Sequence, residues 1–294
     1  MKSWTISRRV KTSLLTAFVL LLFYVLLGFG GHCLSAAEKF PDTPAGRLAA
    51  ADGVLIIGHR GNARFAPENT LVSFQSAIRA GADVVEFDYM VTRDGVQVAF
   101  HDKDLDRTTN AAKILKKSKL SVGDVTAAEL SKLDAGAWFN PRFRGAGVPK
   151  LSESLDLIQK DRMTMIERKT GDAAACVKLL KEKELLDQVV VQAFDWEYIT
   201  EFRRLAPDAL LGALGGNELT VEKLDAMEQS GAQLVGWNQD LSAADVKAIH
   251  DRGMKVWVYT VNSPRIARKL IEKGVDGLIT DDPATMVQLR NSLR

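Results

Sequence analysis

The sequence lacks a large excess of either charge. Its 39 Lys and Arg residues are opposed by 37 Asp and Glu residues, so the formal net charge is +2. Four of the positive residues (Lys2, Arg8, Arg9 and Lys11) lie in the first 37 residues, which contain no acidic residue. The remainder therefore has 39 − 4 = 35 positive against 37 negative residues, a net charge of −2. Because this part has no basic stripe, we do not expect a nucleic acid as partner.

Proline and low-complexity segments are also scarce. The chain has 8 Pro and 22 Gly without a repeat, and 46% of its residues are hydrophobic. This composition excludes a collagen-like or disordered chain and supplies enough apolar residues for a core.

Long hydrophobic runs are absent except near the amino terminus. There, basic residues precede the uncharged run Leu14–Phe29, and the small residues Ser35, Ala36 and Ala37 follow. This order is typical of a secretory signal peptide, which we place at residues 1–37. The run is shorter than the roughly 20 residues that usually span a bilayer. We therefore expect export to the periplasm or medium; an uncleaved membrane anchor is the alternative.

Cysteine is nearly absent. Cleavage after Ala37 would remove Cys33 and leave Cys176 as the single thiol. A single cysteine cannot form an internal disulfide or a thiolate metal site, so the fold must depend on its core.

From residue 52 to residue 294, short apolar runs rich in β-branched residues alternate with amphipathic segments. Strands are expected at Val54–Gly58, Val84–Val91, Met163–Glu167, Val189–Ala193, Ala209–Ala213, Gln233–Gly236, Lys255–Thr260 and Asp276–Thr280. Helices are expected at Thr70–Ala80, Ala173–Leu186, Trp196–Leu205, Ala243–Asp251 and Pro264–Glu272. Eight strands with helical connections predict a (β/α)₈ TIM barrel. A doubly wound open sheet is the alternative, but no glycine-rich dinucleotide turn follows the first strand.

Residues 89–150 interrupt this alternation. They contain one further strand, Val96–His101, and a short helical stretch at Ala127–Leu133. A long irregular segment within a compact domain is often functional. We interpret it as an insertion after the second strand that covers one mouth of the barrel.

Two acidic residues share one face of the second expected strand. Glu86 and Asp88 are two residues apart in an apolar run, so their side chains point the same way. Such carboxylates are costly to bury unless a cation or donors compensate them. Asp94-Gly95 indicates a tight turn, and a turn centred between Arg93 and Asp94 would place His101 opposite Glu86. Because register slips are easy, we predict the proximity of His101 to the two acids rather than the exact pairing.

Polar residues also end two other strands. His59 and Arg60 follow the first strand, and Glu167 and Lys169 share a face at the end of another. In a barrel, the carboxyl ends of the strands form the mouth where active sites lie. Each residue has a structural interpretation when taken alone, but their conjunction favours a site. The carboxylates suit Mg²⁺ or Ca²⁺, and the two cations suit a phosphate. His250, near a helix end, is interpreted as a surface residue.

In this order along the chain, the motifs resemble the glycerophosphodiester phosphodiesterase family. The matching segments are His59-Arg60-Gly61, Pro67-Glu68-Asn69-Thr70, Glu86-Phe87-Asp88, His101-Asp102, Asp106-Arg107-Thr108-Thr109, Pro149-Lys150-Leu151-Ser152-Glu153, Ile166-Glu167-Arg168-Lys169, Val191-Gln192-Ala193-Phe194-Asp195, Thr260-Val261-Asn262 and Gly274 to Asp281. The resemblance implies metal-dependent hydrolysis of glycerophosphodiesters to glycerol 3-phosphate and an alcohol. It also implies a (β/α)₈ barrel with an insertion after the second strand.

The resemblance assigns roles residue by residue. It implies that Glu86, Asp88 and Glu167 bind the divalent cation and that His59 and His101 are catalytic. Arg60 and Lys169 match the family's phosphate-binding cations. Our hypothesis is that His59 is the base and His101 the acid, since an imidazole with a pKa near 6.5 suits both tasks.

The sequence departs from the family's pattern at two positions. Tyr259 stands where Trp is common; its ring could still pack against the glycerol carbons. Arg168 replaces an apolar residue, but alternation turns it away from the mouth. Lysophospholipase-D-like or cyclising enzymes that act on lysolipids would use the same residues. A barrel that only captures phosphorylated ligands is a further alternative; the complete set of histidines and acids argues against it.

Overall fold

The computed structural model describes residues 40–293 of the chain. The predicted signal segment, residues 1–37, lies outside the described residues. Among residues 40–293, no helix is both long and apolar enough to cross a membrane.

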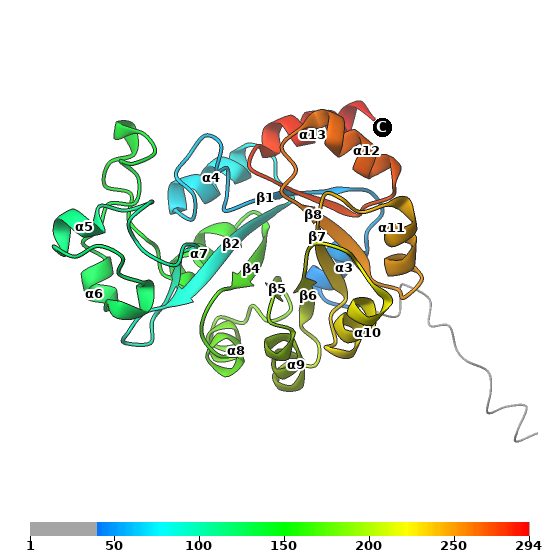
Figure 1. Cartoon of the computed structure of the whole chain (residues 1–294), viewed down its shortest axis with the longest axis horizontal. Coiled ribbons are helices and arrows are strands. Elements are labelled where there is room, and N and C mark those ends of the chain that lie inside the picture. Colours follow the sequence, from blue (N-terminus) through cyan, green and yellow to red (C-terminus); the bar gives the residue numbers. More distant parts are fainter. Residues whose placement is uncertain (1–39, 294) are drawn as a thin grey trace, which may run out of the picture. The chain divides into compact units, whose positions relative to one another are not determined.

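Eight parallel strands form a closed (β/α)₈ barrel, as the alternation predicts (Figure 1). Their bounds are β1 Leu55–Gly58, β2 Val84–Val91, β4 Met163–Arg168, β5 Val189–Ala193, β6 Leu210–Leu214, β7 Leu234–Asn238, β8 Lys255–Tyr259 and β9 Gly277–Thr280. The strands pair in this order, and β1 pairs with both β2 and β9 to close the ring. A ninth strand, β3 (Gln97–Ala99), lies antiparallel to β2.

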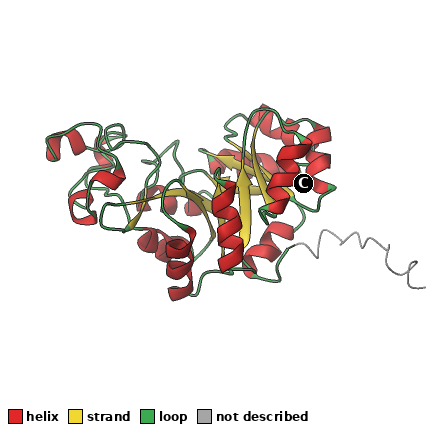
Figure 2. Ribbon diagram, turned by 60° about the horizontal axis from the view of Figure 1, so that its bottom comes forward, coloured by secondary structure: helices red, strands yellow, loops and turns green. Residues whose placement is uncertain are grey.

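Helices surround this barrel (Figure 2). They are α4 Leu71–Arg79, α7 Leu151–Ile158, α8 Ala173–Glu182, α9 Trp196–Leu205, α10 Val221–Gln229, α11 Ala243–His250, α12 Pro264–Glu272 and α13 Pro283–Ser292. Most begin at a residue whose side-chain oxygen accepts a hydrogen bond from the first turn, such as Thr70 before α4 and Asp195 before α9. Such caps satisfy backbone donors that the helix leaves unpaired. Apolar residues between strands and helices form the larger core.

A second apolar cluster fills the interior of the barrel. It contains inward-facing residues such as Leu55, Met165 and Trp257, packed with Ala45 of helix α3 (Pro44–Ala50). The Ala45 amide donates to the carbonyl of Asp187, which precedes β5, so α3 lies at the amino ends of the strands. With that end closed by apolar packing, the polar residues at the carboxyl ends are left to form the site.

The insertion has its own structure and its own small core. Its helices are α5 Ala111–Ile114, α6 Ala127–Leu130 and two 3₁₀ turns, Val122–Asp124 and Pro141–Phe143. Buried apolar residues, among them Phe100, Leu105 and Leu130, hold these pieces against β2 and β3. The expectation that the insertion covers the mouth is wrong, because it extends to the side of the barrel (Figures 1 and 2). It contributes a wall and its first residues to the site.

The register of the β2–β3 hairpin also differs from the expectation. Tyr89 pairs with Ala99 and Val91 with Gln97, one residue away from the register that would place His101 opposite Glu86. The cause is a three-residue loop, Arg93 to Gly95, closed by a hydrogen bond from the Thr92 amide to the Val96 carbonyl. Gly95 has a φ of 82°, as three-residue hairpin loops require at this position.

Candidate active site

Three carboxylates converge at the carboxyl ends of β2 and β4. The two strands are neighbours, and Asp88 lies beside Glu167 in their register, with Glu86 one pleat below on the same face. Carboxylate oxygens of Glu86, Asp88 and Glu167 lie within 4.8 Å of one another. All three residues are buried, with exposed fractions of 1%, 1% and 8%. Three anions this close and this buried require compensating cations.

Two cations partly supply that compensation. The Arg60 guanidinium lies 3.3 Å from an Asp88 oxygen, and the Lys169 ammonium lies 3.3 Å from the other. Lys169 also forms an ion pair with Glu167. Asn69 donates to Asp88 at 2.9 Å through its side-chain amide. Asp88 is therefore the most compensated member of the triad.

The pKa values of the three acids reflect this uneven compensation. Burial and the neighbouring Asp88 and Glu167 carboxylates raise the pKa of Glu86 well above its usual value. Burial and Asp88 raise the pKa of Glu167 to about 7. Burial alone would raise the pKa of Asp88, but the charges of Arg60 and Lys169 outweigh it and hold that pKa below its usual value. The triad thus retains uncompensated repulsion that a further cation would relieve.

Backbone geometry fixes Arg60 in place. Arg60 has a φ of 50°, in the left-handed region that non-glycine residues rarely adopt. Its amide donates to Glu86 Oε2 at 2.9 Å, and its carbonyl accepts from the Ser73 hydroxyl at 2.9 Å. Gly61 follows with a φ of 89°, and a Cβ there would lie 2.6 Å from the Ser73 carbonyl carbon. The His59-Arg60-Gly61 turn therefore needs glycine at its third position.

His59 is oriented by an acid from the last strand connection. Its Nδ1 forms a 2.7 Å hydrogen bond with Asp281 Oδ1, and Asp281 also accepts from the Asn262 side-chain amide at 2.6 Å. Burial alone would raise the pKa of Asp281, but these partners outweigh it and hold the pKa below its usual value. An ionised Asp281 accepts a hydrogen bond from the protonated Nδ1, which leaves Nε2 of a neutral His59 as the acceptor.

His101 has a carboxylate partner of its own. Its Nδ1 forms a 2.9 Å hydrogen bond with Asp102 Oδ1. Arg107 donates to Asp102 and also to Glu68, which in turn accepts from Arg60 at 2.7 Å. The hydrogen bond from Arg107 lowers the pKa of Asp102 to about 2. Burial lowers the pKa of His101 itself, which makes its protonated form a stronger acid.

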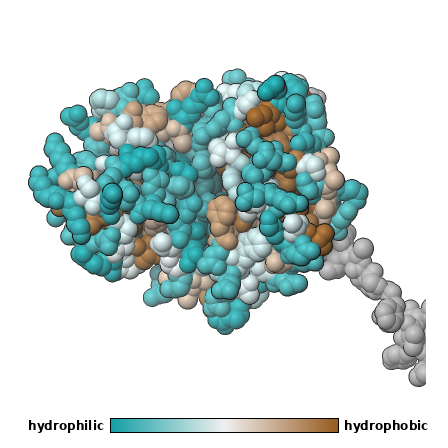
Figure 3. Space-filling view, viewed as in Figure 1, coloured by the Kyte–Doolittle hydropathy of each residue, from teal (hydrophilic) through white to brown (hydrophobic). Residues whose placement is uncertain are grey.

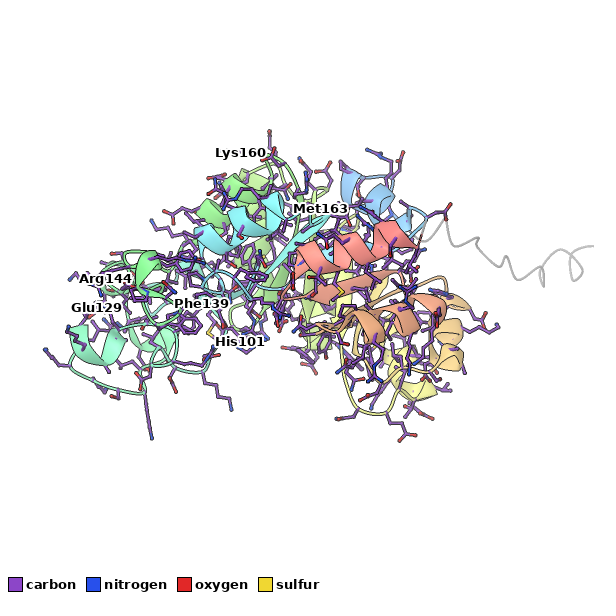
Figure 4. All side chains as sticks on the ribbon, turned by 90° about the horizontal axis from the view of Figure 1, so that it is seen from above. His101, Glu129, Phe139, Arg144, Lys160 and Met163 are labelled. Atoms are coloured by element: carbon purple, nitrogen blue, oxygen red, sulfur yellow. The ribbon has the colours of Figure 1, made fainter. Side chains whose placement is uncertain are left out.

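These groups surround a pocket of about 260 Å³. Its walls include both histidines, Arg60 and Lys169, Glu86 and Glu167, and the rings of Phe194 and Tyr259. The Tyr259 hydroxyl donates to the Gly215 carbonyl, so Tyr259 presents its ring rather than its oxygen to the pocket. Figure 4 shows His101 where the insertion meets the barrel, whereas Glu129 and Arg144 lie further out in the insertion.

The structure brings together all eight residues that the sequence singled out. Their individual roles remain predictions, because the geometry alone assigns none. Sequence reasoning gave no role to Asp281, Asp102, Arg107, Glu68 or Asn69, although all belong to the quoted motifs. A signal was present for Asp281, since it directly follows the last strand and so lies at the same mouth. The interpretation of His250 is incomplete: besides lying at the surface, it forms a 2.8 Å hydrogen bond with Asp276.

Comparisons with known proteins agree with this architecture. Residues 59–285 match the model of the glycerophosphoryl diester phosphodiesterase family. A glycerophosphodiester phosphodiesterase of Caldanaerobacter subterraneus is 33% identical over 242 residues, covering 80% of this chain and 97% of that protein. One from Bacillus subtilis is 32% identical over 296 residues, covering 93% and 96%. The structure of an Oleispira antarctica phosphodiesterase with the product sn-glycerol 3-phosphate is similar, with a TM-score of 0.75 at 27% identity, covering 81% of this chain and 96% of that one.

Proposed function

The chain belongs to the glycerophosphoryl diester phosphodiesterase family and is a phosphoric diester hydrolase, and we propose that it hydrolyses glycerophosphodiesters to glycerol 3-phosphate and an alcohol. The observation that carries the proposal is the pocket itself. Two carboxylate-paired imidazoles, two cations and the buried carboxylates of Glu86 and Glu167 line one cavity of about 260 Å³, and Asp88 lies within ion-pair distance of both cations. A phosphodiester is anionic, and this wall offers both charge neutralisation and proton transfer.

The buried triad fits a divalent cation. Three carboxylates within 4.8 Å of one another are the hard oxygen ligands that Mg²⁺ and Ca²⁺ prefer. The raised pKa values of Glu86 and Glu167 reflect repulsion that such an ion would remove. A cation bound by Glu86, Asp88 and Glu167 would neutralise charge on the phosphoryl oxygens.

Arg60 and Lys169 bind the phosphoryl group beside the triad. Both side chains line the pocket and already lie within ion-pair distance of its acids. As negative charge develops on the equatorial oxygens, these two cations stabilise it without having to move far. The rings of Tyr259 and Phe194 face the same cavity and pack against the carbon atoms of the glycerol.

The histidines divide the proton transfers between them. His59 accepts a proton from the attacking nucleophile, which is water or the neighbouring glycerol hydroxyl. Attack by the glycerol hydroxyl gives a cyclic phosphate, which water then opens to glycerol 3-phosphate. Asp281 supports this step, because its carboxylate stabilises the imidazolium that forms. As the bond between phosphorus and the alcohol oxygen breaks, His101 donates its proton to that oxygen. Asp102 holds the His101 ring in position through Nδ1.

The proposal includes export of the enzyme, with residues 1–37 removed as a signal peptide. It rests on the order of basic, apolar and small residues in that segment. The mass of the chain recovered from cells tests it. A mass that still includes residues 1–37 in a membrane fraction would instead indicate an anchor.

Release of glycerol 3-phosphate tests the proposed activity. Glycerophosphocholine is incubated with the purified chain as isolated, with chelator, and with Mg²⁺ or Ca²⁺ restored in excess. We expect release that the chelator abolishes and one of the two ions restores. Release that is insensitive to the chelator would refute the metal site, and cleavage of lysophosphatidylcholine alone would identify a lysolipid enzyme.

Figure 3 shows a largely hydrophilic face, as expected for an enzyme that acts on dissolved diesters.

A further inference from the structure

A groove adjoins the catalytic pocket on its His101 side. It has a volume of about 760 Å³ and lies between the β2–β3 hairpin, the 3₁₀ turn Val122–Asp124 and the loop after β4. His101 and Lys169 line both the groove and the catalytic pocket, so the two cavities meet at these side chains. A molecule held at the phosphoryl site can therefore extend into the groove past His101.

A second, polar cavity of about 390 Å³ adjoins the pocket on its His59 side. It shares His59 and Arg60 with the catalytic pocket and is otherwise lined by groups such as Arg64, Asn262 and Asp281. The phosphoryl site thus has one exit past each histidine. In an in-line displacement, the attacking oxygen and the leaving oxygen lie on opposite sides of phosphorus. The leaving alcohol must therefore lie on the side of the general acid.

Resting on the proposed function, we infer that the groove past His101 is the binding site for the leaving alcohol and that it takes bulky alcohols that carry no positive charge. The size follows from its volume, about three times that of the catalytic pocket. Met90, Val91 and Val122 line its apolar side, and Ser121 and Thr170 offer hydroxyls to a polyol such as inositol. In the reaction, the bond from phosphorus to this alcohol oxygen breaks, and the proton from His101 completes the alcohol.

The charge preference follows from Lys103. Lys103 is exposed at the groove, and it has no hydrogen bond or ion pair among residues 40–293. The other charged groups there are already engaged: Asp102 binds Arg107 and His101, and Lys169 binds Asp88 and Glu167. Lys103 is thus the charged side chain of the groove lining that has no partner among residues 40–293, and its ammonium repels a quaternary ammonium but not inositol.

Gly123 offers a way to fill the groove without disturbing the core. Its φ is not in the left-handed region, and a Cβ there would lie 3.8 Å from Ser121 Oγ and 3.9 Å from the Val91 carbonyl oxygen. These are ordinary van der Waals distances. Gly123→Phe therefore adds a ring to the groove wall, and Gly123→Ala controls for the loss of glycine. Ala63→Phe adds the same ring to the cavity on the His59 side.

The test compares kcat/KM for three diesters of glycerol 3-phosphate: inositol, choline and methyl. We expect Gly123→Phe to lower kcat/KM for the inositol diester at least about tenfold and to change that for the methyl diester less than about twofold. Ala63→Phe should not reproduce this selectivity for the large alcohol. Lys103→Glu should raise the ratio of choline to inositol kcat/KM about three- to tenfold, since it reverses one charge near the alcohol.

Equal losses on the inositol and methyl diesters in Gly123→Phe would overturn the inference, as would selective loss in Ala63→Phe. An unchanged choline to inositol ratio in Lys103→Glu would overturn the charge preference. Because the parent chain is measured on the same three diesters, failure of the proposed function is seen separately, as a lack of glycerol 3-phosphate from all of them.

Discussion

Replacing His101 with alanine tests the division of roles between the two imidazoles. If His101 protonates the leaving alkoxide, its contribution to kcat depends on how basic that alkoxide is. General acid–base catalysis contributes about 10²–10⁴-fold, equal to about 2.7–5.5 kcal/mol of transition-state stabilisation. We expect His101→Ala to lower kcat for an inositol or methyl diester by about 10²–10⁴-fold. With the 4-nitrophenyl diester of glycerol 3-phosphate, whose leaving group departs as a stable anion, the loss should fall below about tenfold.

The supporting carboxylates give graded versions of the same test. The Asp102–His101 hydrogen bond of 2.9 Å involves a charged acceptor, and such a bond contributes about 1.5–3 kcal/mol. Asp102→Asn should therefore lower kcat for alkyl diesters about 10- to 150-fold and have little effect on the nitrophenyl diester. Asp281→Asn removes the charge that supports His59, the proposed base, so it should lower kcat by the same factor for both kinds of substrate.

Initial rates of glycerol 3-phosphate release, measured for the parent chain and four variants on both substrates, decide the matter. His59→Ala is the matched control, since a base is needed whatever the leaving group. A loss in His101→Ala that is the same for the alkyl and nitrophenyl diesters would refute the acid role of His101. A leaving-group dependence found in His59→Ala instead would show that the two roles are reversed.

Three further predictions concern metal binding and stability. Mg²⁺ or Ca²⁺ at 100 times its Kd should stabilise the parent chain by about 2.7 kcal/mol and so raise its thermal unfolding temperature. Glu86→Gln should lose most of this rise in temperature; an equal rise in both proteins would exclude the triad as the binding site. Gly61→Ala should lower the free energy of unfolding in urea by more than Gly95→Ala does, because both have a positive φ but only Gly61 lies against Ser73; equal losses would contradict this. Asp276→Asn should cost about 1–3 kcal/mol at pH 7, since Asp276 accepts from His250, Lys255 and the Val256 amide, each at 2.8 Å. These partners outweigh burial and hold the pKa of Asp276 below its unfolded value near 4, so the difference should persist above about pH 4 and shrink as the pH falls below it towards the lower folded pKa; a difference that stays constant as the pH falls below about 4 would show that packing, not charge, is responsible.

Most of the fold could be predicted from the spacing of apolar residues within single segments. Eight of the expected strands correspond to barrel strands within about two residues at either end, because alternating and β-branched runs are signals within a single segment. The same rule placed Arg168 outside the barrel. There it donates to the Gly171 carbonyl and to Asp195, and lies over the Tyr198 ring. Helices α3, α7, α10 and α13 were not predicted, although Thr43, Thr220 and Asp282 provide cap signals before three of them.

Contacts between segments were predicted less well, and the hairpin shows why. Asp94-Gly95 correctly marked the turn, but a loop of two residues and a loop of three share this signal. One additional residue shifts every pair in the ladder, so His101 is not the partner of Glu86. The proximity of His101 to the acids was nevertheless predicted, because it depends only on the hairpin existing. The direction in which the insertion extends depends on its own small core, which no periodic pattern revealed.

The acids that orient the histidines illustrate a different limit. Asp102 is adjacent to His101, whereas Asp281 is 222 residues from His59. What joins the distant pair is the closing of the barrel: β9 pairs with β1, Gly58 lies beside Thr280, and the residues that follow each strand emerge side by side. Parallel strands in a closed ring make such a neighbour obligatory. Once eight strands are predicted, the residue after the last strand should therefore be examined as a partner for the residue after the first. Applied to this sequence, that rule selects Asp281 for His59 before any coordinates are known.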